Sequence, residues 1–181
     1  ARIVLQQRPD ARFVFVGEGT GVRKRGLRLR QAIERYGLAD RLLMLGYRWD
    51  VPDIIAACDL VVIASIGTEA SPIVLREALA SGRPVVATRV GDVTDVIRDR
   101  EHGLIVPPRS PEKMAAAILE FVENPDLAAR CAENGLRLAR DQFSFDQMME
   151  HKLRVDAQIA KKNRANQGAS LEPLSTLNGG K

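Results

Sequence analysis

Short apolar runs rich in Val, Ile and Leu alternate along this sequence with longer segments of helical periodicity. The apolar runs are bounded by Gly or Pro and favour strands at residues 12–16, 42–45, 60–64, 84–88 and 104–106. The helical patterns fall at residues 22–36, 51–58, 72–81, 111–123 and 125–140, and from about 146. Strands joined by helices of this length indicate βαβ crossovers. The sequence therefore predicts an α/β, Rossmann-like fold, a parallel sheet with helices on both faces.

The loops that follow the predicted strands are the expected places for function. In open parallel sheets, ligands bind outside the carboxyl ends of the strands. These loops cover residues 17–21, 46–50, 65–71 and 89–94. We therefore look for site residues there.

The length of 181 residues suits one ordinary domain, and the chain starts inside a pattern. Residues 1–9 resemble the last turns of a helix, so we expect an N-terminally truncated domain at residues 1–160. The polar residues 161–181 are expected to form a mobile tail. No apolar run approaches the ~18 residues of a membrane-spanning helix, and no secretory signal is visible.

Cysteine and histidine content gives no sign of a metal site. Cys58 and Cys131 lie far apart in apolar contexts, and the chain has only two His. Neither cysteine belongs to a zinc-ligand pattern. We expect both to be buried free thiols and expect no bound metal.

The net charge of +4 is concentrated in an Arg-rich segment at residues 22–36. We expect this segment to be a solvated helix face, whose apolar side is formed by Val22, Leu27, Leu29 and Ile33. A contribution to attracting an anionic ligand is the alternative. Nucleic acid is not an expected partner, because only 4% of the residues are aromatic and could stack on bases.

The helix predicted at residues 72–81 has complete terminal signals and an open N-terminus. Ser71 is the expected N-cap, Pro72 the first helical residue, and Gly82 ends the helix. Its first free N–H groups would bind phosphate or sugar hydroxyls, and they belong to Ile73, Val74 and Leu75. Because the helix is apolar almost all round, we expect it to be buried.

Two glutamates flank this helix start. A buried Glu77 needs a partner for its carboxylate, either a ribose diol or a nearby arginine such as Arg76 or Arg83. Glu69 precedes the helix, where it could act as a cap-like anion or face a sugar. The residues leave both alternatives open.

Glu69 and Glu77 form E-x7-E, followed by Ala-Leu-Ala-Ser-Gly-Arg-Pro-Val-Val-Ala-Thr-Arg-Val-Gly-Asp at residues 78–92. This segment resembles the donor-binding signature of family 4 of the retaining glycosyltransferases. Further similarity lies at residues 8–19, 45–48, 57–65, 102–108 and 143–146, and the resemblance covers about residues 1–160.

The resemblance implies the C-terminal, nucleotide-sugar-binding half of a GT-B fold. Glu77 would hold the ribose, and Glu69 would contact the donor sugar as the catalytic residue. The helix start at Ser71, Ile73, Val74 and Leu75 would bind the diphosphate, with Gly17 and Gly19 forming the family's Gly-x-Gly turn and Tyr47 and Arg48 beside the base. The donor would be UDP-, GDP- or ADP-linked, and transfer would proceed with retention, without a metal or cofactor.

The resemblance also implies parts that lie upstream of Ala1, namely an acceptor-binding domain and the family's phosphate-gripping Arg and Lys. We therefore expect this chain alone to be inactive. The full enzyme would serve cell-envelope polysaccharide synthesis in the cytoplasm, with peripheral attachment to the inner face of the membrane as an alternative.

Several departures and rival functions bear on the substrate. Ala70 replaces the family's Gly, one extra residue precedes Glu69, and Asp95 stands where Glu is common, which leaves the donor sugar undetermined. A nucleotide-sugar 2-epimerase-like domain and a non-catalytic nucleotide-binding module are the alternatives. A dinucleotide dehydrogenase is disfavoured, because Val22 occupies the position of its third glycine.

Overall fold

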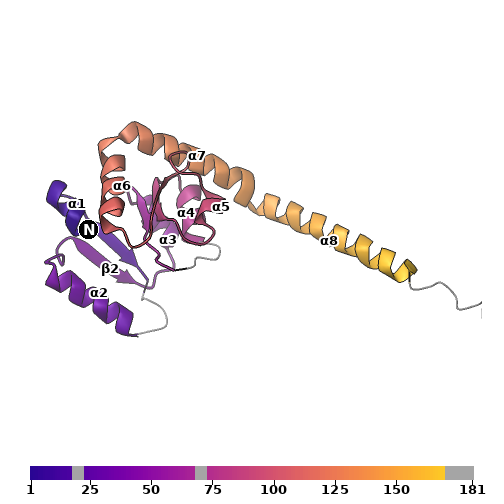
Figure 1. The fold of residues 1–181 in the computed structure, drawn as a ribbon, viewed down its shortest axis with the longest axis horizontal. Helices are drawn as coiled ribbons and strands as arrows, with labels where there is room; N and C mark the ends of the chain where they lie inside the picture. Colours follow the sequence, from indigo (N-terminus) through magenta and orange to yellow (C-terminus); the bar gives the residue numbers. More distant parts are fainter. Residues whose placement is uncertain (18–22, 68–72, 170–181) are drawn as a thin grey trace, which may run out of the picture. The chain divides into compact units, whose positions relative to one another are not determined.

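The computed structural model describes residues 1–17, 23–67 and 73–169, in which strands and helices alternate as predicted (Figure 1). In chain order the elements are α1 (Arg2–Gln7), β1 (Phe13–Val16), α2 (Arg23–Arg35), β2 (Leu42–Gly46), α3 (Val51–Ala56), β3 (Val61–Ile63), α4 (Ile73–Ala80), β4 (Val85–Thr88), α5 (Val93–Val96), β5 (Leu104–Val106), α6 (Pro111–Glu123), α7 (Pro125–Phe143) and α8 (Phe145–Ala169). The chain divides into one compact unit at Ala1–Arg140 and a second from Asp141.

The described strands form two parallel sheets, β1-β2 and β3-β4-β5. In the larger sheet Val62 lies opposite Val86, and Val86 lies opposite Leu104. Val86 joins the apolar cluster of α6, so its neighbours Val85 and Ala87 face the other side, where α4 packs on β3 and β4. Every residue of β4 is buried, as expected for a parallel strand covered on both faces. The predicted Rossmann-like α/β class is confirmed.

The main core lies between the sheet and the helices α1, α6 and α7. It contains Val4 of α1, Phe121 of α6 and Leu127 of α7, together with β4 and β5 residues. Cys131 is fully buried in this core, and its thiol donates to the carbonyl of Arg100 at 3.6 Å. Burial raises the pKa of the Cys131 thiol and of the half-buried Cys58 thiol. Both cysteines are free.

The helix α4 is less buried than its composition suggested. Leu75, Ala78 and Leu79 are fully buried, whereas Ile73 is 69% exposed and Val74 is 38% exposed. The expectation of burial all round is therefore wrong for the first turn. Composition shows only that a helix is apolar. Its packing against neighbouring elements decides which of its turns is buried.

Two further features differ from the sequence analysis. The segment at residues 89–94 contains the start of a short helix, α5, because a single turn has too few residues to show a helical period. Leu27 is exposed, so the inward side of α2 is formed by Leu29 and the buried Ile33. Val22 lies outside the described residues.

The last helix, α8, continues to Ala169, beyond the predicted start of the polar tail at residue 161. The segment contains no Pro, and its Lys, Arg, Ala and Gln residues have high helix propensity. A polar composition was therefore misread as an absence of helix for residues 161–169. Residues 170–181 lie outside the described part of the chain.

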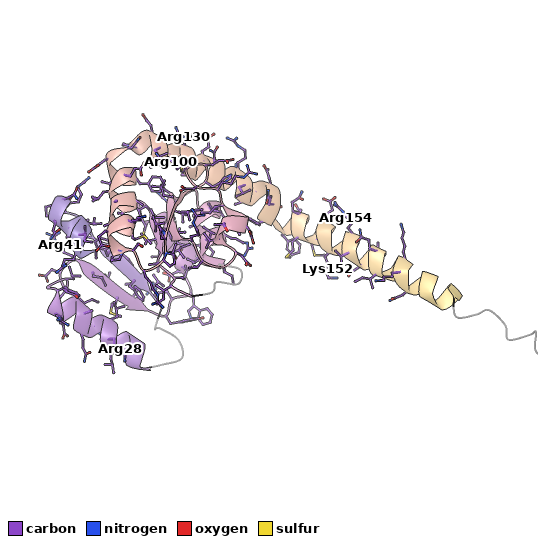
Figure 2. The ribbon with its side chains drawn as sticks, viewed as in Figure 1. Arg28, Arg41, Arg100, Arg130, Lys152 and Arg154 are labelled. Carbon is purple, nitrogen blue, oxygen red and sulfur yellow. The ribbon has the colours of Figure 1, made fainter. Side chains whose placement is uncertain are left out.

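The basic residues labelled in the first unit, Arg28, Arg41, Arg100 and Arg130, come from different parts of the chain (Figure 2). Arg28 belongs to α2, Arg41 precedes β2, Arg100 precedes β5 and Arg130 belongs to α7. Arg100 pairs with Glu120 of α6 at 2.7 Å. In the part of the chain that the structure covers, no helix combines the length and apolarity needed to cross a membrane.

Candidate functional site

A hydrogen bond between two glycines joins the carboxyl ends of β1 and β2. The N–H of Gly17 donates to the carbonyl of Gly46 at 2.7 Å. Gly17 has a φ of +115° and Gly46 a φ of +67°, which L side chains rarely adopt. A Cβ at either position would meet nothing within 4 Å, so the requirement for glycine is conformational. Gly19, the other glycine predicted for this turn, lies outside the described residues.

Two aromatic rings stand on the loop after β2. Tyr47 and Trp49 stack edge to face with their centroids 5.0 Å apart, and Trp49 is 87% exposed. Between them, Arg48 donates two hydrogen bonds to the carboxylate of Asp50, at 2.7 and 2.5 Å. This contact lowers the pKa of Asp50. The sequence analysis predicted Tyr47 and Arg48 here but missed Trp49. As the chain's single Trp, placed in a loop after a strand, it could have been noticed.

The loop between β3 and α4 is held at its start by a buried hydroxyl. Thr88, at the end of β4, is buried, and its Oγ1 lies 2.6 Å from the carbonyl oxygen of Ser65 and 3.2 Å from that of Ile63. Sequence reasoning missed Thr88, because a Thr in a strand usually reflects β propensity alone. Glu69 and Ser71, predicted for this loop, lie outside the described residues.

The described part of α4 begins at Ile73, at the position predicted for a phosphate-binding helix start. The exposed Ile73 and Val74 mark a first turn that neighbouring elements leave open. Val74 lines the same hollow as Val16 of β1 and Val62 of β3. The start of α4 therefore lies beside both strands, although Leu75 points its side chain into the core.

Glu77 lies one helical turn after Ile73, on the same side of α4. Its side chain is half-buried. Arg83, one of the arginines weighed as its partner, instead donates to the carbonyl of Ala56. Within residues 1–17, 23–67 and 73–169, Glu77 forms no ion pair.

Acidic and metal-ligating side chains were also searched for clusters. In the part of the chain that the structure covers, no three His, Cys, Asp or Glu side chains gather so as to hold a metal ion. The described features at the strand ends include the first described turn of α4, two exposed aromatic rings, the Arg48–Asp50 ion pair and the carboxylate of Glu77. This set suits a ligand with phosphate, hydroxyl and ring groups.

Comparison with known proteins gives one family. The family described as glycosyl transferases group 1 matches residues 1–137. Among curated relatives, the lipopolysaccharide core biosynthesis mannosyltransferase LpsB of Rhizobium meliloti is 32% identical over 147 residues, which are 80% of this chain and 42% of that protein. The chain spans about 34 to 42% of the length of the first curated relatives.

Several solved structures are also similar to this chain. Anabaena Alr3699/HepE in complex with UDP is 28% identical, with a TM-score of 0.75 over 91% of this chain and 44% of that one. The C-terminal domain of the glycosyl transferase group 1 family protein LpcC from Francisella tularensis is 26% identical, with a TM-score of 0.70 over 80% of this chain and 76% of that one.

Proposed function

This chain belongs to the glycosyl transferases of group 1, and we propose that it is the donor-binding domain of such an enzyme. In the full-length protein it would bind a nucleotide-diphosphate sugar and take part in moving the sugar to an acceptor with retention of configuration. The likeness to a C-terminal domain of another group 1 protein supports the domain assignment. The UDP complex of HepE supports a nucleotide-diphosphate ligand.

The observation that carries the proposal is the exposed first described turn of α4, together with the half-buried carboxylate of Glu77 one turn further on. The first-turn amides of Ile73, Val74 and Leu75 lack helical acceptors and lie at the positive end of the helix dipole, which favours phosphate oxygens. Glu77 on the same side of α4 would accept hydrogen bonds from two ribose hydroxyls, since a carboxylate can accept several. One surface would thus bind adjoining parts of the same nucleotide.

We propose that the other predicted contacts surround this surface. The glycine turn at Gly17 permits a ligand to approach the backbone closely, because the position lacks a Cβ. Tyr47 and Arg48 would flank the base, and the exposed Trp49 offers a further aromatic face. Glu69 would face the sugar and stabilise positive charge at the anomeric carbon. We propose no metal, because the helix start would supply the phosphate-binding charge.

We propose further that the full-length protein acts in the cytoplasm, where the alternative is attachment to the inner face of the membrane. A role in cell-envelope polysaccharide synthesis is supported by the similarity to a protein named for lipopolysaccharide core biosynthesis. The acceptor-binding domain would precede Ala1.

The role of Glu77 is testable by nucleotide binding. Calorimetric titration of UDP, GDP and ADP into the full-length protein identifies the base. For the nucleotide that binds, Glu77→Ala should weaken binding about 10- to 100-fold, because hydrogen bonds to a charged group contribute about 1.5–3 kcal/mol.

The matched control is Glu34→Ala, which removes an exposed glutamate from helix α2. We expect this variant to bind like the unchanged protein. Unaltered binding by folded Glu77→Ala would show that Glu77 does not hold the ribose. Absence of binding by all three nucleotides would contradict the proposed function itself.

A further inference from the structure

The positive charge of helix α2 plays no part in the donor site proposed above. The helix contains six Lys and Arg residues and one acidic residue, Glu34, so its positive excess is larger than the net charge of +4 of the whole chain. Ile33 is buried and Leu29 is half-buried on its inward side. Because these two residues pack inward, the opposite side of α2 points to solvent.

The exposed arginines of α2 have no carboxylate partner. Elsewhere in the first unit, Arg137 pairs with Glu133 at 3.3 Å and Arg100 pairs with Glu120 at 2.7 Å. Three exposed arginines of α2 form no ion pair among the described residues: Arg28, Arg30 and Arg35. A surface with uncompensated positive charge attracts anions.

The cations are spread along α2 rather than gathered at one point. A helix of 13 residues is about 20 Å long. Arg28, which Figure 2 labels on this helix, lies two turns before Arg35, and the exposed Gln31 lies between them on the same side. Leu27 is 57% exposed and lies one turn before Gln31. The outward side of α2 therefore presents separated positive charges with an exposed apolar side chain among them.

An anionic lipid bilayer fits this surface better than a nucleic acid does. A guanidinium group can donate two hydrogen bonds to one phosphate, and a bilayer offers phosphates across a whole plane. An exposed leucine gains free energy where it enters the headgroup region, whereas the phosphates of a nucleic acid give it no apolar contact. The helix has no aromatic residue that could stack on bases. Clusters of about four to eight Lys and Arg on an amphipathic helix are typical of binding to anionic lipids.

We propose that the outward side of α2 docks the full-length protein on a bilayer that contains anionic phospholipids. Arg28 and Arg35 bind lipid phosphates, and Leu27 enters the headgroup region beside them. The proposal supplies a surface for the membrane attachment named above as an alternative, and it does not depend on the donor site.

Sedimentation of the full-length protein with lipid vesicles tests the proposal. Vesicles of phosphatidylglycerol and phosphatidylcholine are compared with vesicles of phosphatidylcholine alone. The double variant Arg28→Gln with Arg35→Gln should bind the anionic vesicles about 10- to 30-fold more weakly, because each cation near an anionic surface strengthens binding about fivefold. The matched control Arg98→Gln with Arg137→Gln removes the same charge from two exposed arginines outside α2 and should bind like the unchanged protein.

The variant Leu27→Gln separates a bilayer from other polyanions. It should bind the anionic vesicles about fivefold more weakly, as expected when part of an apolar side chain no longer enters the interface. Unchanged binding of this variant would overturn the assignment of a bilayer as the partner. Displacement of the unchanged protein from the vesicles by duplex DNA at equal phosphate concentration would overturn it as well, because α2 would then face a nucleic acid.

The two double variants decide the role of the α2 surface. Stronger binding to anionic than to neutral vesicles, weakened by the α2 variant and kept by the control, supports the proposal. Equal binding to both kinds of vesicle would overturn it, and so would an equal loss in the two double variants. Far-UV circular dichroism of each variant shows that a loss of binding is not a loss of fold. Nucleotide binding is measured separately, so failure of this proposal is distinguishable from failure of the proposed donor site.

Discussion

At the scale of single residues, the hydroxyl of Thr88 holds the start of the loop that leads to the candidate site. Thr88 itself is not among the residues predicted to bind the ligand. Thr88 is buried at the end of β4 and contacts the carbonyl oxygens of Ile63 and Ser65, where the chain leaves β3. The loop that starts there leads to α4. A hydroxyl donor at this place therefore fixes the start of the loop against the neighbouring strand.

The variant Thr88→Val keeps the shape of this side chain and removes its donor. We expect it to lower the free energy of unfolding by about 1–3 kcal/mol, because a buried polar contact is lost. Urea unfolding of the purified chain measures this value. Thr94→Val, which makes the same change at an exposed position of α5, should stay within about 0.5 kcal/mol of the unchanged chain. An equal effect of the two variants would show that the Thr88 hydroxyl contributes nothing.

At the scale of elements, the boundary between α6 and α7 is set by one side chain. The N–H of Leu127 donates to Oδ1 of Asn124 at 3.0 Å, and Pro125 begins α7 without an N–H to satisfy. This is the arrangement of a capped helix start. α7 then carries Leu127 and Cys131 into the main core.

Removal of this cap should weaken the whole first unit. We expect Asn124→Ala to lower the free energy of unfolding by about 0.5–2 kcal/mol, as measured for other N-caps. Asn124→Asp keeps an accepting oxygen and should retain most of the stability. The comparison of both variants by thermal unfolding tests the cap. A loss as large in Asn124→Asp as in Asn124→Ala would contradict it.

The packing of α4 is consistent with the ligand-binding role proposed for it. Its second turn packs on β3 and β4 through Leu75, Ala78 and Leu79, which fixes the helix in place. Its first turn stays open, with Ile73 and Val74 exposed beside the ends of β1 and β3. As proposed above, such a helix would bind an anion at its N-terminal end.

At the scale of the whole molecule, the proposed function requires more than this chain. The chain spans less than half of its first curated relatives, and we propose that an acceptor-binding domain in the remaining part completes the enzyme. We therefore expect the 181-residue chain alone to release no nucleotide diphosphate from UDP-, GDP- or ADP-sugars. The full-length protein should do so in the presence of its acceptor. Turnover by the isolated chain would refute this prediction.

The sequence by itself determined the class of fold, because its apolar runs carry the strand and helix periods directly. Leu104–Val106 and Pro111–Glu123 were predicted with the bounds that the structure shows, since Gly, Pro or a cap residue marks their ends. A resemblance to glycosyltransferases was likewise visible in the segment from Glu69 to Asp92, and the match over residues 1–137 shows the group 1 family.

Only the tertiary structure decided what surrounds each element. Sequence periodicity left the partner of Glu77 open between a nearby arginine, Arg76 or Arg83, and a ligand. In the described part of the chain Arg83 donates to the carbonyl of Ala56 and forms no ion pair with Glu77. The exposed first turn of α4 and the contacts of Thr88 could not be predicted for the same reason. Both depend on residues distant in sequence, whereas a local pattern reports only the conformation of its own segment.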